Sequence, residues 1–170
     1  MVMAETDEKE RKRIEKEIEK LVKRAKMAVD AEDYSKAVTF YQESARLAKS
    51  IEDKRAVDFS MDAARHSIKL GDNFKAGWSY KCAADHSFFF EDYNNTINFA
   101  MKAIKYFSTS GSMYIVQWCY NLVGEASEKM KDYELAIKNY RKSLEIEHSE
   151  EIEKKIENLT EKKRKAKGKR

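Results

Sequence analysis

Two side chains with the chemistry of metal ligands, Cys82 and His86, lie four residues apart in the sequence. On an α-helix this spacing places both on one face, where a thiolate and an imidazole can share a metal ion. Cys119, His66 and His148 occur singly and form no second pair. Cys82 is followed by two alanines, a context typical of close helix packing. We therefore predict no metal site.

The motifs of common catalytic sites are absent from the sequence. It has no Gly-rich phosphate loop, no Gly-x-Ser-x-Gly elbow and no His-Glu-x-x-His motif. Trp78 and Trp118 could stack on a cofactor, but they are 40 residues apart, as equivalent positions of two repeats would be. This spacing favours a core or groove-lining role. The sequence thus predicts a protein that is not an enzyme and holds no cofactor.

The other polar and aromatic residues indicate a role in protein–protein interaction. We expect several helices to contribute to an inner, partner-binding surface through Lys23, Lys26, Lys69, Tyr80, Lys81, Gln117 and Asn121. A further candidate is the run Phe88, Phe89 and Phe90. Successive helical positions point about 100° apart, so three adjacent rings cannot all face one core. At least one should lie at an edge, either as a hydrophobic anchor for a partner or membrane surface or packed against the next hairpin.

Basic residues gather at the C-terminal end. Residues 161–170 carry a net charge of +6, against −2 for residues 1–160. The basic residues are Lys162, Lys163, Arg164, Lys165, Lys167, Lys169 and Arg170. We interpret this segment as a flexible, solvated tail. The alternative is an accessory factor that binds nucleic acid or an anionic surface through the tail.

The composition indicates which secondary-structure elements position these residues. Pro is absent and Gly occurs only five times in 170 residues, so residues that interrupt helices are rare. Apolar residues make up 42%, enough for a core, but no apolar run approaches the roughly 18 residues of a membrane span. The N-terminus turns acidic at once, unlike a signal peptide. Two unpaired cysteines favour a reducing compartment, and we predict a cytoplasmic protein.

A short signature recurs with a fixed period. A small polar residue, an aromatic ring, two variable positions and a small residue follow one another at 33–37, 73–77, 92–96 and 132–136. Tyr34 to Phe74 and Tyr93 to Tyr133 are both 40 residues, and Tyr114 continues the first series. The polar residue can cap a helix, and the ring can anchor that helix against its predecessor.

Two such series offset by half a period predict helices that begin about every 20 residues. We expect eight of them, at 7–30, 34–50, 53–70, 74–90, 93–109, 112–130, 133–147 and 150–165. The short loops between them require antiparallel neighbours. The sequence therefore predicts an all-α, right-handed α-solenoid of antiparallel helix hairpins over residues 1–160, with a broad concave face.

The last hairpin resembles the tetratricopeptide repeat. Tyr120, Val123, Gly124 and Ser127, followed by the signature at 132–136 and by Tyr140, match that consensus of bulky, small and aromatic positions. The middle of the chain, KLGDNFKAGWSYKCAA at 69–84 and INFAMKAIKYF at 97–107, is similar to the soluble NSF attachment proteins (SNAPs). The 40-residue period also favours this group over ordinary tetratricopeptides, whose period is about 34.

The resemblance implies an adaptor that lays one face along a bundle of SNARE helices and engages a AAA ATPase. The expected partner is a helical bundle or a peptide segment of another protein, with peripheral membrane contact as a further option and nucleic acid disfavoured. The chain departs from the SNAPs at two points. It ends in a basic run in place of their acidic, leucine-containing end, and it has no counterpart at 30–32 of their aromatic membrane-touching loop.

Overall fold

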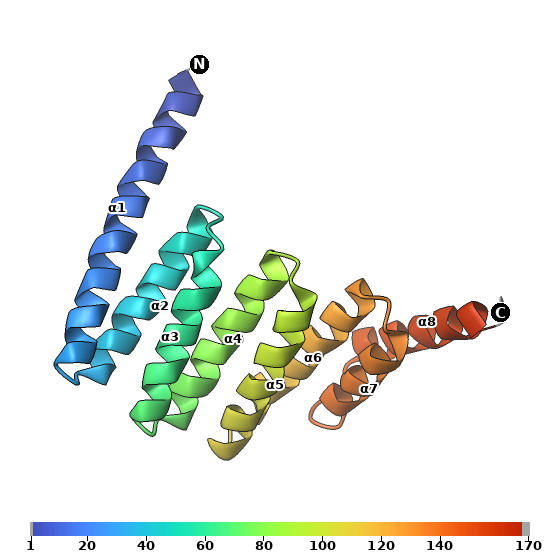
Figure 1. Ribbon diagram of the computed structural model, residues 1–170. Coiled ribbons are helices and arrows are strands. Elements are labelled where there is room, and N and C mark those ends of the chain that lie inside the picture. Colours follow the sequence, from blue (N-terminus) through green and yellow to red (C-terminus); the bar gives the residue numbers. More distant parts are fainter. Residues whose placement is uncertain (1, 168–170) are drawn as a thin grey trace.

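The computed structural model of the protein describes residues 2–167, with side chains from residue 8 to residue 165. Within that range it contains eight α-helices and no strand (Figure 1). The helices are α1 (Val2–Asp30), α2 (Tyr34–Ser50), α3 (Arg55–Lys69), α4 (Asn73–Phe89), α5 (Tyr93–Thr109), α6 (Met113–Lys129), α7 (Tyr133–Leu144) and α8 (Glu150–Lys167). The number and order predicted from the sequence are confirmed.

One type of turn joins the first seven helices. In each of these six turns one residue has a positive φ: Glu32, Glu52, Gly71, Glu91, Gly111 and Lys131. At the first turn, the amide of Asp33 donates to the carbonyl of Ala28 at 2.8 Å and that of Glu32 donates to Val29 at 3.0 Å. This is the Schellman pattern, which satisfies the last carbonyls of the helix.

In five of the six turns the residue after the positive-φ position is the N-cap of the next helix, whereas after Glu52 the N-cap is Lys54, two residues further on. The carboxylates of Asp33, Asp72, Asp92 and Asp132 each accept a hydrogen bond from the backbone amide three residues further on. Such a cap satisfies one of the free amides at a helix N-terminus. The end of one helix and the start of the next are thus joined by a loop of only a few residues. Such a short loop makes the next helix run antiparallel to the previous one.

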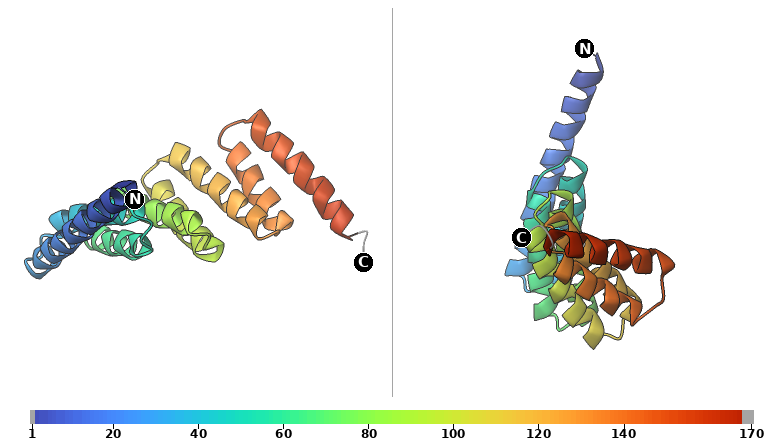
Figure 2. Two further views of the ribbon diagram at one scale, coloured as in Figure 1. Left: turned by 90° about the horizontal axis from the view of Figure 1, so that it is seen from above. Right: turned by 90° about the vertical axis from the view of Figure 1, so that its right-hand side faces the viewer.

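The helices form an open stack. The main packing contacts join consecutive helices only, from α1 with α2 to α7 with α8. The chain therefore advances from the blue end to the red end without folding back, and its two termini lie at opposite ends (Figures 1 and 2). The core is correspondingly divided into three clusters, within α1–α3, α3–α6 and α7–α8. This is the α-solenoid expected from the sequence, and it is not a closed bundle.

Two glycines allow aromatic rings to pack directly on a helix backbone. A Cβ on Gly124 of α6 would lie 2.5 Å from a ring carbon of Tyr140 in α7. A Cβ on Gly77 of α4 would lie 3.1 Å from the ring of Phe107 in α5. Both rings are fully buried. Small residues thus mark the points where helices cross most closely.

The expectation that each signature ring packs on the preceding helix does not hold for every ring. Tyr93 does so, edge-on to Phe88 at 5.6 Å between centroids. Tyr34 instead stacks on His66 of α3, and Phe74 packs edge-on against Phe107 of α5. Tyr114 is 76% exposed and anchors nothing. A ring at the first or second position of a helix therefore does not always pack on the preceding helix.

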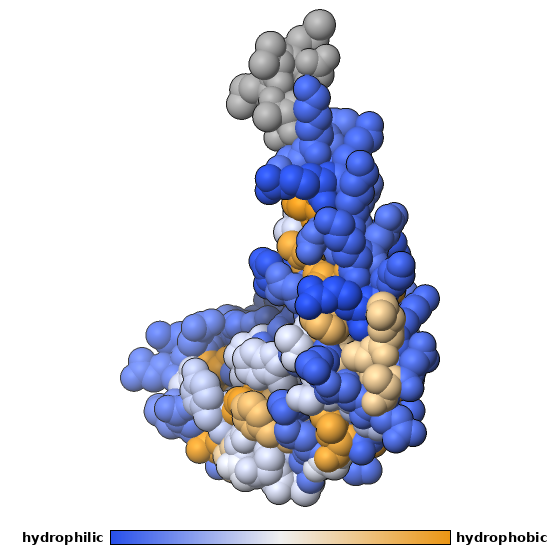
Figure 3. All heavy atoms as spheres, turned by 90° about the vertical axis from the view of Figure 1, so that its left-hand side faces the viewer, coloured by the Kyte–Doolittle hydropathy of each residue, from blue (hydrophilic) through white to orange (hydrophobic). Residues whose placement is uncertain are grey.

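Helix boundaries differ from the prediction at several points. α1 begins at Val2 rather than at 7, α3 begins at Arg55, and α7 ends at Leu144. The cap of α4 is Asp72, so Asn73 is its first helical residue. The N-terminal part of α1 extends beyond the neighbouring helices (Figure 1), and on the face shown in Figure 3 its described side chains are mainly hydrophilic. Among the described residues, no helix is long and apolar enough to cross a membrane.

The basic C-terminal segment has no separate beginning in the structure, because α8 continues through residue 161 to Lys167. Lys163 pairs with Glu134 of α7 at 2.9 Å, and Lys165 pairs with Glu161 at 2.7 Å. Lys169 and Arg170 lie outside the described residues, as does the side chain of Lys167. The described part of the segment is thus an extension of the last helix.

Candidate functional site

Alternate helices α2, α4 and α6 present equivalent positions on one side of the solenoid. Their N-caps are Asp33, Asp72 and Ser112. Six residues after these caps stand Thr39, Trp78 and Trp118, and nine residues after them stand Gln42, Lys81 and Asn121. Positions three apart share a helix face. We call the surface defined by these six residues the α2–α4–α6 face.

Lys81 joins the two tryptophans of this face. Its ammonium lies 3.8 Å from the ring centroid of Trp118 and 5.3 Å from that of Trp78. It also pairs with Asp85 at 2.9 Å. Burial raises the pKa of Asp85, with the Lys81 ammonium acting in the opposite direction. A largely buried cation between two aromatic rings contributes about 1–2 kcal/mol, so this cluster is held firmly in place.

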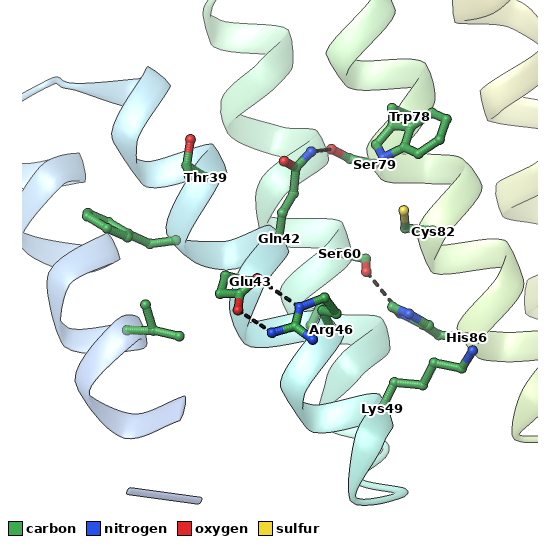
Figure 4. A pocket seen from close by; sticks show the side chains of 13 residues that line it. Thr39, Gln42, Glu43, Arg46, Lys49, Ser60, Trp78, Ser79, Cys82 and His86 are labelled. Atoms are coloured by element: carbon green, nitrogen blue, oxygen red, sulfur yellow. Dashed lines mark hydrogen bonds and ion pairs between the residues drawn. The ribbon is translucent and has the colours of Figure 1, made fainter. Parts of the chain in front are cut away.

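A pocket of about 670 Å³ adjoins the cluster (Figure 4). Its walls come mainly from α2 and α4, with one residue each from α1 and α3. The lining residues are Leu21, Thr39, Phe40, Gln42, Glu43, Ala45, Arg46, Lys49, Ser60, Trp78, Ser79, Cys82 and His86. The volume falls within the roughly 300–1,000 Å³ range of ligand pockets, and the mixture of apolar walls with a few polar groups is typical of them.

Internal hydrogen bonds hold the polar groups at the base of the pocket. Ser60 Oγ donates to the carbonyl of Ala56 at 3.0 Å. The same carbonyl lies 3.2 Å from His86 Nδ1 and has no hydrogen to give, so Nδ1 carries the proton and donates. Ser60 Oγ, 3.1 Å from Nδ1, therefore accepts from the ring. The pair does not form a nucleophile and its base, because the serine proton points away from the imidazole.

Burial determines the protonation of this region. It lowers the pKa of His86 by disfavouring the imidazolium, only partly countered by the hydrogen bond to Ala56. It raises the pKa of the Cys82 thiol to about 11. A thiol that stays protonated is a poor nucleophile, because the thiolate is the reactive form. Within the described residues no group of three or more His, Cys, Asp or Glu side chains could hold a metal ion.

Charged side chains of α2 line the outer part of the pocket. Arg46 Nε donates to Glu43 Oε2 at 2.9 Å, and this hydrogen bond is the largest cause that lowers the Glu43 pKa. Gln42 Nε2 donates to Ser79 Oγ at 3.3 Å and links α2 to α4. Lys49 lies 5.4 Å from the ring centroid of Phe89. Sequence reasoning missed Glu43, Arg46 and Lys49, since charges on an amphipathic helix carry no sign of a pocket beside them.

The predicted partner-binding residues are dispersed over the structure. Lys81 and Asn121 lie on the α2–α4–α6 face. Lys23 and Lys26 line a different, smaller pocket between α1 and α3. Lys69, at the end of α3, lies 4.9 Å from the ring centroid of Tyr34. The inner surface predicted from these lysines is therefore not one continuous site.

Two other predicted residues face neighbouring elements. Tyr80 is buried and stacks on Tyr106 of α5 at 5.6 Å between centroids. Gln117 is buried and donates to the carbonyl of Glu147 in the loop before α8 at 3.2 Å. Both side chains stabilise helix packing, and neither is available to a partner.

The three phenylalanines diverge as their spacing requires. Phe88 packs on the central core cluster, and Phe90 packs on the N-terminal one. Phe89 is 45% exposed and lies near Lys49 at the edge of the pocket. Of the three, only Phe89 is placed to act as an anchor for a partner.

The fold and this face define a helical-repeat protein of tetratricopeptide-like architecture. Residues 119–148, which span most of α6 and all of α7, match the tetratricopeptide repeat family. They include the Gly124–Tyr140 crossing. No curated protein matches the chain.

Among solved structures, the chain is similar to a crystal structure of the de novo designed helical repeat protein DHR64. The identity is 21%, over 95% of this chain and 96% of that one, with a TM-score of 0.34. It is also similar to the DHF119 filament, with 19% identity over 93% and 95% of the two chains and a TM-score of 0.33.

Proposed function

We propose that this protein is a non-enzymatic interaction scaffold whose α2–α4–α6 face binds a helical or extended segment of another protein. One observation carries the proposal: Trp78 and Trp118 occupy equivalent positions of adjacent repeats, flank Lys81, and adjoin a pocket of about 670 Å³. In this proposal the face corresponds to the concave surface expected from the sequence.

The exposure of Trp78 supports a binding role. Its side chain is 41% exposed although a tryptophan gains much free energy from burial. Tryptophan, tyrosine and arginine supply most of the energetically dominant contacts in protein interfaces. The neighbouring cations, Lys81 on the face and Arg46 in the adjoining pocket, are paired within the chain. A partner therefore meets apolar surface that is already positioned, with few side chains left to order.

The resemblance to the SNAPs suggests which partners to test first. A SNARE-like helical bundle and a AAA ATPase are the candidates that it implies. The proposal also assigns the protein to a reducing cytoplasm, in accord with Cys82 and Cys119 being free thiols. These assignments are parts of the proposal and do not decide which face is used.

The alternative function rests on the basic C-terminal segment. Lys162, Arg164 and Lys165 are exposed on α8 and continue into Lys167. Binding of nucleic acid or an anionic surface through them would weaken steeply with salt and disappear on removal of residues 162–170. Binding through the α2–α4–α6 face predicts weak salt dependence and no effect of that deletion.

Truncation of the tryptophans tests the proposal. We expect Trp78→Ala to weaken the affinity for the protein partner by about 30-fold, the effect of losing roughly 2 kcal/mol at a central interface residue. Met101→Ala is the matched control, because Met101 is similarly exposed on α5, outside the face. Equal affinity of the two variants, both shown to be folded by circular dichroism, would exclude this face as the binding surface.

A further inference from the structure

Lys49 is the one cation lining the pocket whose ammonium, among the described side chains, forms no ion pair. Its charge acts to lower the pKa of Asp85, but the ion pair of Asp85 is with Lys81. Arg46 is paired with Glu43, and Lys81, on the adjoining cluster, is paired with Asp85. The described ion pairs include none to Lys49, whose ammonium lies 5.4 Å from the ring centroid of Phe89. Its charge reaches the pocket wall, since it adds to the effect of burial in lowering the pKa of His86.

The rest of the pocket combines apolar walls with polar side chains that are mostly bonded within the chain, as Gln42 is to Ser79 and Arg46 is to Glu43. Leu21, Phe40, Ala45 and Trp78 supply apolar walls. The hydroxyls of Ser60 and Thr39 donate to carbonyls of their own helices. A ligand that fits must therefore be mainly apolar, with one negative group placed at Lys49.

We propose that this pocket receives a peptide segment of the partner in which an apolar side chain stands beside a single aspartate or glutamate. The apolar side chain packs between Phe40 and Trp78, and the carboxylate pairs with Lys49. This inference rests on the proposed function and specifies the chemistry of its partner.

The position of Lys49 favours a carboxylate over a phosphate. Lys49 lies in the last turn of α2, where the free carbonyls carry a partial negative charge. The neighbouring Arg46 is already engaged by Glu43. One positive charge next to a negative helix end balances a carboxylate, whereas a phosphate carries almost two charges and usually requires several free donors or an arginine cluster.

A peptide selection tests the inference with the purified protein. It does not require that the cellular partner which supplies the bound segment be known. The full chain is used to select binders from a library of random linear peptides, and the binders are measured by fluorescence anisotropy. We expect the selected peptides to share an acidic residue at a fixed spacing from an apolar one. Lys49→Gln should weaken their binding about two- to fivefold, the range for a partly exposed charge pair. Lys49→Arg should retain it.

Two further comparisons make the result specific. Lys105→Gln removes a lysine exposed on α5, far from the pocket in sequence, and should leave the affinity unchanged. Replacing the acidic residue of the peptide by its amide should cause the same loss as Lys49→Gln, and the two changes together should cause no further loss. That coupling identifies the pair directly.

The other outcomes separate this inference from the proposed function. Peptides whose binding is lost in Trp78→Ala but unaffected by Lys49→Gln would overturn the carboxylate assignment and leave the binding face intact. Selected peptides that carry phosphomimetic acidic clusters, or no acid at all, would do the same. If no selected peptide is weakened by Trp78→Ala, the proposed function fails and the inference with it.

Discussion

The contact between Gly124 and Tyr140 allows a quantitative test of how these helices pack. In Gly124→Ala the new methyl carbon would lie 2.5, 2.7 and 2.8 Å from three ring carbons of Tyr140. Carbon atoms normally approach to about 3.5–4.0 Å, so ring and methyl must separate by about 1 Å. The ring is fully buried and its hydroxyl donates to Glu128 at 2.6 Å. The Tyr140 ring is therefore fixed both by its packing and by the hydrogen bond of its hydroxyl.

The expected net effect is a loss of stability. Overpacking of this kind costs about 1–3 kcal/mol, or more where the surroundings cannot yield. The exchange of Gly for Ala in a helix interior returns about 1 kcal/mol. Because the contacts at Gly124 are far inside normal distances, we expect the clash to exceed that gain, with a net loss of about 1–2 kcal/mol. At Gly77 the corresponding distance is 3.1 Å, and Gly77→Ala should be neutral within about 1 kcal/mol.

Urea unfolding followed by far-ultraviolet circular dichroism measures both variants. The transition midpoint should fall for Gly124→Ala and stay near the wild-type value for Gly77→Ala, with an unchanged dependence on urea. Replacing Tyr140 by leucine should destabilise the Gly124→Ala protein less than it destabilises the wild type, because the clash is then already relieved. A Gly124→Ala protein at least as stable as the wild type would refute this account of the crossing.

Three further predictions concern the turns, the buried histidine and the caps. Glu91 has a φ of 61°, which glycine adopts more readily than glutamate, so Glu91→Gly should stabilise the fold by about 0.5–1 kcal/mol. Gly71 has a φ of 68°, so Gly71→Ala should destabilise the fold by a similar amount. Thermal unfolding tests both variants. Burial lowers the pKa of His86, so the unfolded chain binds more protons, and stability should fall as the pH drops below about 6.5. His86→Gln should flatten that fall in unfolding free energy measured between pH 7.5 and 5, and an unchanged slope would contradict it. Asp132→Ala removes the cap of α7 and should cost about 1 kcal/mol in urea unfolding.

The helices and their order could be predicted because the starts of α2, α4, α5 and α7 are encoded locally. A capping aspartate, a ring and a small residue recur at a fixed period, and Ala37 and Ala136 are fully buried where the signature requires a small side chain. With loops of a few residues, antiparallel packing follows. The spacing of the signature along the sequence is thus enough to predict the open stack of helices.

The faces of the helices were harder to predict. Tyr80 and Lys81 are adjacent, but a rotation of about 100° sends one into the contact with α5 and the other between the tryptophans. If the predicted orientation of a helix is wrong by one residue, the buried and the exposed member of such a pair are interchanged. The pocket was not predictable at all. It depends on how far α2 and α4 stand apart above α3, which is set by the summed sizes of packed side chains and not by any motif.

Site-specific photocrosslinking tests the central claim that the α2–α4–α6 face holds a protein partner. A photoreactive residue replaces Thr39 or Asn121 on the face, or Lys105 or Lys138 on α5 and α7, in the cells that make the protein. The account predicts one discrete crosslinked partner from Thr39 and Asn121, which is lost when Trp78→Ala is added, and none from Lys105 and Lys138. A partner crosslinked from Lys105 or Lys138 alone would contradict it.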